Sequence, residues 1–298
     1  MTAVRDSEGT FSAEIKGLAP STVYEYRLVL TSLESGEEEI LAAPSDVTTE
    51  NAVPVPNGGF ETTSNDESNK YKSFYDPSSS DPTLQKQWWG NGNKGATLVG
   101  SGSVICYPDA SDYKEGTQSV CLQSRWVVVK FAAGNLFSGH FGDLIGTTGG
   151  TVYFGRPFTA RPTALRLWVK YSGGVINRES GNVPSDGKKG NYDKASIRIA
   201  LGTWDFRKYG GTESCPVEVN TTDKSSFFDP AGQDVIAYGR FVTDHDMEWT
   251  KVEIPLEYVS TSRRPTHIIV SCAASMLGDY FTGSPDSILW IDDMRLEY

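Results

Sequence analysis

The chain has 298 residues and a mass of 32.6 kDa, and its 38% hydrophobic and 22% charged residues are typical of a globular protein of about two domains. Its 38 acidic against 27 basic residues give a formal net charge of −11 and a pI near 4.8. This charge repels a polyanion at long range, which excludes nucleic acid as the main partner. No apolar run approaches the roughly 18 residues that a membrane span needs, and the N-terminal residues carry no secretory signal.

Residues 1–50 are predicted to form a small β domain, with strands over 11–16 and 22–31 and a turn at Ser35-Gly36. The pattern Leu18-x-Pro20-x-Thr22-x-Tyr24-x-Tyr26-Arg27 resembles the last three strands of a fibronectin type III or immunoglobulin-like sandwich, with Tyr24 as the corner tyrosine. A complete sandwich of that kind needs about 100 residues, so we expect a partial domain whose first strands lie upstream. A three-stranded appendage on a larger domain is the alternative.

Residues 51–59 have the composition of a short, stiff linker, and residues 54–298 are predicted to form one large β-sandwich. The segments 165–171, 196–201 and 251–256 alternate strictly between apolar and polar residues, which indicates half-buried strands. Further strands are expected at 118–131, 235–242, 267–274 and 287–297. No window carries a helical periodicity, so the predicted class is all-β, with a jelly-roll sandwich as the main domain.

The start and the end of this large domain carry a recurrent pattern. Asn57-Gly58-Gly59-Phe60-Glu61 opens it and Leu289-Trp290-Ile291-Asp292-Asp293-Met294-Arg295-Leu296 closes it, and this bracket resembles the galactose-binding-like jelly roll of many carbohydrate-binding modules. Residues 130–139, 155–165 and 278–283 resemble a Bacteroidetes family called the Putative carbohydrate metabolism domain, in which a jelly roll often follows an immunoglobulin-like domain. The resemblance implies an extracytoplasmic, carbohydrate-linked role and fixes neither substrate nor reaction.

An aromatic residue flanked by cations is the clearest sugar-binding candidate. The apolar residues of strand 165–171 share one face, so Arg166, Trp168 and Lys170 are expected together on the other. A flat ring contacts the C–H face of a pyranose, and polar groups around it bond the hydroxyls. The alternative is a Trp168 ring covered by a loop or by the N-terminal domain.

Two loops supply further candidates for ligand binding. Trp88 and Trp89 stand beside amide side chains, and we expect one ring in the core and the other exposed. Tyr209 lies in a glycine-rich loop and is predicted to close over a ligand. The alternative for Tyr209 is an ordinary loop tyrosine.

Two carboxylates of the bracket predict a structural calcium site. The first and last strands of a jelly roll come close, so Glu61 and Asp292 are expected to meet, with Asp292 turned inward on the face of Met294. A buried carboxylate pair is costly unless a cation or hydrogen bonds compensate, and Ca²⁺ accepts carboxylate and carbonyl oxygens. In the alternative, backbone amides satisfy Glu61 and solvent hydrates Asp292.

Catalysis has weaker support in the sequence. A glycoside hydrolase usually needs two carboxylates about 5 to 10 Å apart, and no spacing among the 38 acidic residues singles out a pair. Asp205, after a tryptophan, and Asp279, in the turn 278–283, are the two catalytic candidates. A capping role in its own turn is the alternative for Asp279.

The four cysteines lack the C-x-x-C spacing of zinc knuckles and thioredoxin-like motifs. Cys106 and Cys121 flank a turn-like segment nearly symmetrically. They are therefore candidates for a disulfide across a hairpin, which a sequence alone does not decide because the distance is not known.

These features favour a secreted or surface-anchored two-domain β protein. Residues 1–50 act as a spacer, and the jelly roll at 54–298 binds a polysaccharide or oligosaccharide without chemistry of its own, beside neighbouring surface proteins of glycan utilisation. A glycoside hydrolase is the alternative. A third hypothesis is an adhesion or assembly protein that recruits subunits through exposed strand edges.

Overall fold

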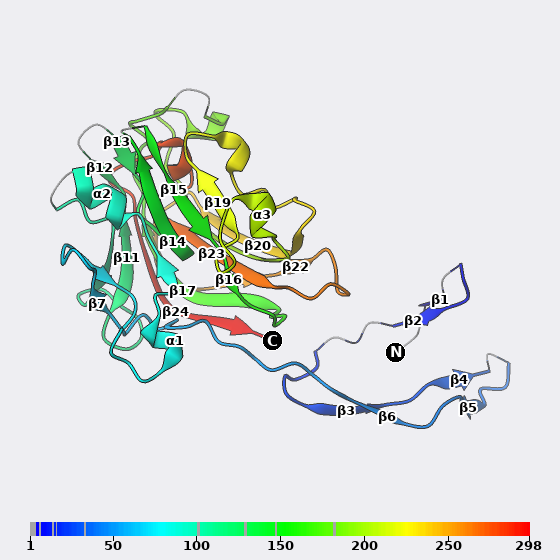
Figure 1. The fold of residues 1–298 in the computed structure, drawn as a ribbon. Helices are drawn as coiled ribbons and strands as arrows, with labels where there is room; N and C mark the ends of the chain where they lie inside the picture. The colour runs from blue at the N-terminus through cyan, green and yellow to red at the C-terminus, as the bar shows by residue number, and fades with distance from the viewer. Residues whose placement is uncertain are drawn as a thin grey trace. The chain divides into compact units, whose positions relative to one another are not determined.

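The computed structural model describes residues 4–5, 7–13, 15, 17–32, 34–99, 102–127, 130–146, 148–180 and 183–298. These residues form mainly β-strands joined by loops, which confirms the all-β class (Figure 1). The chain divides into two compact units, Met1–Val53 with Tyr298 and Pro54–Glu297. Within the described part of the chain, no helix is long and apolar enough to cross a membrane.

The N-terminal unit consists of paired short strands. β3 and β4 run out along one arm of a ribbon and β5 and β6 return along the other, and β1 pairs separately with β2. Their bounds are β1 (Val4–Arg5), β2 (Phe11–Ser12), β3 (Val23–Tyr26), β4 (Val29–Thr31), β5 (Glu38–Ile40) and β6 (Ser45–Thr48). The Tyr24 hydroxyl accepts a hydrogen bond from the Ala19 amide at 2.8 Å, the upstream backbone contact that a corner tyrosine makes. The resemblance to a sandwich stays a prediction.

The larger unit is built on two antiparallel sheets. The five-stranded sheet has the order β10 (Cys106–Asp109), β11 (Ser119–Gln123), β24 (Ile288–Glu297), β17 (Ala164–Ser172) and β21 (Met247–Pro255). The nine-stranded sheet has the order β19 (Val217–Asn220), β15 (Gly149–Phe154), β14 (Asn135–Ile145), β23 (His267–Ala273), β18 (Ala195–Gly202), β20 (Val235–Thr243) and β22 (Glu257–Tyr258). β16 (Arg156–Pro157) also pairs with β23, and β9 (Trp89–Gly90) with β14.

Short elements complete the larger unit. Two small β-ribbons are formed by β7 (Ser64–Asn65) with β8 (Lys72–Ser73) and by β12 (Arg125–Val127) with β13 (Lys130–Ala132). The helices are α1 (Pro82–Gln85), α2 (Asn93–Val99) and α3 (Phe206–Tyr209), with 3₁₀ turns η1 (Ser185–Gly187), η2 (Lys224–Ser226) and η3 (Gly278–Tyr280). The helices have seven residues or fewer, too short to produce a helical stripe in the sequence.

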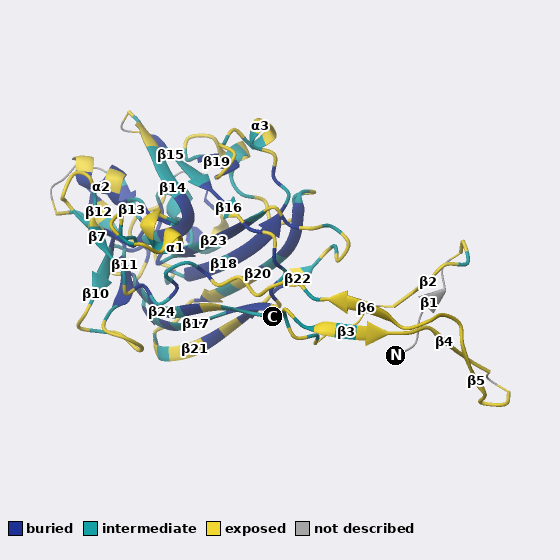
Figure 2. Ribbon diagram, turned by 60° about the horizontal axis from the view of Figure 1, so that its bottom comes forward, coloured by how far each residue is buried: buried dark blue, intermediate teal, exposed yellow. Residues whose placement is uncertain are grey.

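The main core lies between the two sheets. Figures 1 and 2 show β17, β21 and β24 in one layer and β14, β18, β20 and β23 in the other. The predicted apolar faces supply this core, because Leu165 and Leu167 of β17 and Ile197 and Ile199 of β18 are fully buried. Burying each such side chain contributes about 1.5–3 kcal/mol. The opposite face of β18 carries the polar residues of the alternation and lies outside this core.

The predicted disulfide is absent, because all four cysteines are free and buried. In the ladder of β10 and β11, Cys106 stands opposite Leu122 and Cys121 opposite Tyr107. Facing residues of an antiparallel pair point to the same side, and their neighbours point to the other. Cys106 and Cys121 therefore point to opposite faces of the sheet, which a disulfide cannot bridge without backbone movement.

Candidate functional site

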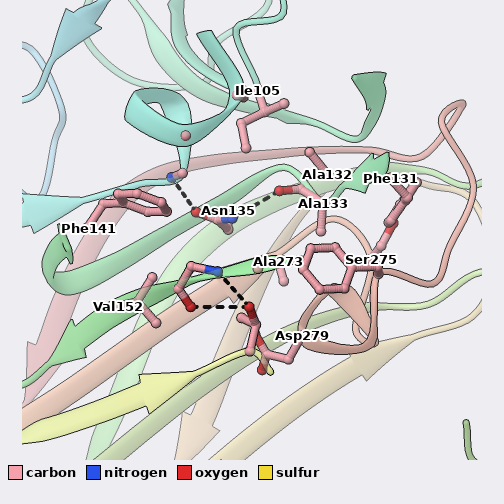
Figure 3. A pocket seen from close by; sticks show the side chains of 18 of the residues that line it. Ile105, Phe131, Ala132, Ala133, Asn135, Phe141, Val152, Ala273, Ser275 and Asp279 are labelled. Atoms are coloured by element: carbon pink, nitrogen blue, oxygen red, sulfur yellow. Dashed lines mark hydrogen bonds between the residues drawn. The ribbon is translucent and has the colours of Figure 1, made fainter. Parts of the chain in front are cut away.

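A cavity of about 260 Å³ lies on the outer face of the nine-stranded sheet (Figure 3). Its floor is formed by two neighbouring rungs that cross β14, β23 and β18. The rungs are Asn135, Ala273 and Ser196 in the first and Phe137, Ser271 and Arg198 in the second. Because the register fixes these side chains on one face of the sheet, the polar side of the β18 alternation forms part of the floor of the cavity.

The walls of the cavity come from elements far apart in the sequence. β15, α2, the β12–β13 ribbon and the turn around η3 all contribute. The rings of Phe141 and Phe281 are half-buried and line it, and Figure 3 places Phe141 on one side and Asp279 below. Gly95 leaves room for the Phe141 ring, because a Cβ on Gly95 would approach the ring to 2.8 Å. The walls are mostly apolar.

Two charged groups face this cavity without a bonded partner in the described part of the chain. The Arg198 guanidinium donates no hydrogen bond there, and its Nε is buried. The Asp279 carboxyl accepts none and lies beyond the 4.0 Å of an ion pair with Arg198, although Arg198 still acts on it electrostatically. A polar group left unpaired inside a protein is costly. This cost applies to the buried Arg198 Nε, and both side chains have hydrogen-bonding capacity left for a polar ligand in the cavity.

Asp279 is positioned by the η3 turn, which ends at Phe281 in the left-handed region (φ 51°). The carboxyl lines the cavity but is closely surrounded by protein. Burial therefore raises the pKa of Asp279 above its ordinary 3.8, and the Arg198 charge opposes this shift only in part. The proton stays on this carboxyl to a higher pH than on an exposed aspartate.

Asp279→Asn is expected to stabilise the folded protein at pH 7 relative to wild type. Between pH 3.8 and the raised pKa, the folded chain binds more protons at Asp279 than the unfolded chain, so wild-type stability falls as pH rises through that interval. Asparagine does not titrate and escapes this loss. Melting curves from pH 3 to 7 test this: the two proteins should converge at pH 3, and a less stable variant at pH 7 would contradict the assignment.

The predicted platform around Trp168 lies on the other sheet. The Lys114 and Lys251 ammonium groups lie 4.8 and 5.4 Å from the centroid of its ring. Arg166 pairs with Glu297 at 2.7 Å, and Lys170 pairs with Asp112 at 2.8 Å. The three residues share the outer face as predicted, but lysines lie over the ring and the two flanking cations are already paired.

The other predicted ligand-binding and catalytic residues also lie outside the cavity lining, except for Asp279. Trp89 is buried and Trp88 half-buried, with their rings 4.5 Å apart, so the expected division between a core ring and an exposed one holds only in part. Tyr209 donates to Asp234 at 2.6 Å and packs on an apolar cluster. Asp205 caps α3 by accepting from the Arg207 amide, which gives it a structural task.

Glu61 and Asp292 converge on one loop. Glu61 accepts from the Thr117 amide and hydroxyl, and Asp292 Oδ2 accepts from the Lys114 and Glu115 amides at 2.8 Å each. These N–H and O–H donors bond the carboxylate oxygens that a cation would need. Over the described residues, no group of three or more His, Cys, Asp or Glu side chains could hold a metal ion. The calcium site stays a prediction.

The prediction that Asp292 shares the inward face of Met294 is wrong. A register shift between Arg166 and Trp168 and a left-handed Asp293 (φ 47°) change the alternation within β24. Asp292 stands opposite Trp168 on the outer face, whereas Met294 is buried with the core. Asp292 is fully buried because the 114–117 loop covers it.

Sequence reasoning missed Arg198, the main polar group of the cavity floor. Its signal was present, because the strand 196–201 alternates and places Arg198 on its polar face. No feature of the sequence favours this polar face over that of residues 165–171 as a binding face. The deciding neighbours, Ser271 and Asp279, come from a later strand and turn.

A sequence profile described as Putative carbohydrate metabolism domain matches residues 59–297. Two solved structures, each described as a putative glycoside hydrolase, are similar in fold. The one from Bacteroides thetaiotaomicron has 21% identity and a TM-score of 0.61, covering 93% of this chain and 79% of that one. The one from Bacteroides vulgatus has 22% identity and a TM-score of 0.57, covering 80% and 96%. No curated protein sequence matches. Since the profile spans most of the chain, the protein belongs to the Putative carbohydrate metabolism domain family.

Proposed function

We propose that the protein binds a glycan in the cavity on the nine-stranded sheet and performs no chemistry on it. The main support for this proposal is that Arg198 and Asp279 face the cavity without hydrogen-bond partners among the described residues. A sugar hydroxyl both donates and accepts, so adjacent hydroxyls match a guanidinium donor and a carboxylate acceptor. The ring of Phe141 offers apolar surface to the C–H groups of the sugar, whereas the Lys130 ammonium lies over the Phe281 ring, 4.1 Å from its centroid.

Binding is favoured over hydrolysis by the acids of the cavity. The usual glycosidase mechanisms need two carboxyl groups on either side of the scissile bond. Asp279 is the one acidic side chain among the described residues that line the cavity. The raised pKa of Asp279 suits a general acid. The competing function is therefore a hydrolase whose second carboxyl group comes from outside the described lining of the cavity.

The family and this ligand class support a setting outside the cytoplasm, where polysaccharides are met. There the protein would hold glycan close to neighbouring proteins that degrade or import it. The N-terminal unit would act as a spacer.

The test is affinity gel electrophoresis against a broad polysaccharide panel, with reducing ends assayed in the same mixtures. Wild type should be retarded by at least one polysaccharide without release of reducing ends. Arg198→Gln and Asp279→Asn should each weaken this retardation at least about tenfold, because each removes a charged hydrogen bond to the ligand. Trp168→Ala, on the opposite sheet, serves as the matched control and should bind as wild type does.

The outcomes distinguish between the two sheets as the binding site, and between binding and hydrolysis. Loss of binding in Trp168→Ala, with Arg198→Gln unaffected and both proteins folded, would move the site to the five-stranded sheet. New reducing ends that disappear in Asp279→Asn would establish the hydrolase. Absence of retardation across a panel that includes neutral, acidic and acetylated polysaccharides would overturn the glycan assignment.

A further inference from the structure

The polar groups of the cavity are gathered at one part of it. Eight polar side chains line it, against fourteen apolar ones and six glycines. Four of the eight are already engaged by the protein. Lys130 donates to Thr148 O, Asn135 bonds Gly92 N and Ala133 O, Thr221 bonds Gly150, and Ser275 donates to Asp193.

The four remaining polar side chains lie close to one another. Arg198 and Ser271 face each other on one rung, and Ser196 stands two residues from Arg198 on the same strand and face. Asp279 lies within electrostatic range of Arg198. None of these four side chains makes a hydrogen bond to the described part of the protein. They form a single polar region, which is open to a ligand.

Away from this polar region, most of the side chains that line the cavity are apolar. Ala96, Ile105 and Val127 form an apolar cluster with Ala132 packed against it, and all four line the cavity. Figure 3 places Ile105 and Ala132 on the side away from Asp279. A sugar hydroxyl placed against such a wall loses its hydrogen bonds to water without a replacement, which is unfavourable. A methyl group there would instead gain from burial.

Resting on the proposed function, we infer that the ligand is a sugar residue carrying an acetyl or methyl group, such as an N-acetylated, O-acetylated or 6-deoxy sugar. Its hydroxyls would meet Arg198, Asp279 and the two serines, and its substituent would lie against the wall formed by Ile105, Val127 and Ala132. An unmodified hexose has hydroxyls around its whole ring and would leave some of them unpaired. The same cavity thus selects against it.

Calorimetric titration with matched pairs of methyl glycosides tests the inference. The pairs are N-acetylglucosamine with glucose, N-acetylgalactosamine with galactose, L-fucose with L-galactose and L-rhamnose with L-mannose. At least one substituted sugar should bind about tenfold or more tightly than its parent, which corresponds to about 1.4 kcal/mol.

A variant of Val127 tests whether the apolar wall causes the preference for the substituted sugar. Val127→Thr replaces a methyl by a hydroxyl at nearly constant volume, and it should reduce the preference for the substituted sugar several-fold. Val259→Thr, on the exposed surface, is the control and should leave the preference unchanged. Equal or better binding of every parent sugar would overturn the inference and leave glycan binding standing. Failure of all these sugars and of the polysaccharide panel would instead overturn the proposed function itself.

Discussion

Asp193→Ala is expected to lower the free energy of unfolding of the larger unit by about 3 kcal/mol or more. The Asp193 carboxylate is buried, and its Oδ2 accepts from Ser275 Oγ, Ser284 N and Ser287 Oγ at 2.6, 2.8 and 2.9 Å. Its Oδ1 accepts from the Lys194 amide at 2.9 Å. Alanine would leave these buried donors without an acceptor, and the segment that carries Asp279 would lose its anchor.

Urea unfolding followed by tryptophan fluorescence measures this loss, since all seven tryptophans lie between residues 54 and 297. Asp193→Asn is the control. Burial outweighs the hydrogen bonds and raises the pKa of Asp193, so its charged form is expensive, and the amide removes the charge while keeping one acceptor oxygen. The asparagine variant should therefore lose much less stability than the alanine variant. A loss below about 1 kcal/mol in Asp193→Ala would contradict the role of this network.

Asp292→Ala is expected to destabilise the same unit by about 2–4 kcal/mol, whereas Glu61→Ala should have a much smaller effect. Both carboxylates hold the 114–117 loop, but Asp292 is fully buried and Glu61 is exposed. Removing Asp292 leaves the Lys114 and Glu115 amides and the Asp293 amide without their acceptor. Water can replace Glu61 at the surface. Similar losses of stability in the two variants would contradict the role assigned to the burial of Asp292.

Thermal melting curves recorded in EDTA and in CaCl₂ test the calcium prediction. If Ca²⁺ binds between the two carboxylates, it stabilises the folded state by mass action, and wild type melts higher in CaCl₂. Glu61→Gln keeps the side-chain length and one acceptor oxygen but removes the charge, so it should abolish that increase. Identical wild-type melts in both buffers would assign the pair to hydrogen bonding alone.

The strands were predictable because their periodicity is local. The alternation of residues 165–171 and 196–201 gave both the strands and the faces that are buried, since a strand repeats every two residues whatever lies beside it. The alternation failed in β24, where the bulge at Asp293 shifts the pattern by one residue. Nothing in the segment itself marks that bulge, because it is set by the pairing with β17.

The choice of binding face was not local. The sequence put Trp168 on a polar face correctly, but Lys114, from a distant loop, lies over its ring. Arg198 has an equally plain pattern, and it lines the cavity together with Ser271 of β23 and Asp279 of the η3 turn, which come from later in the chain.

By itself, the amino-acid sequence determined the all-β class, the buried faces of the central strands and the carbohydrate-related family, since all three rest on short-range patterns. Only the tertiary structure decided which sheet face is open, which acid lines the cavity without a hydrogen-bond partner among the described residues, and that Cys106 and Cys121 point to opposite faces. These depend on strand register and on long-range contacts, where one residue of shift moves a side chain to the other face.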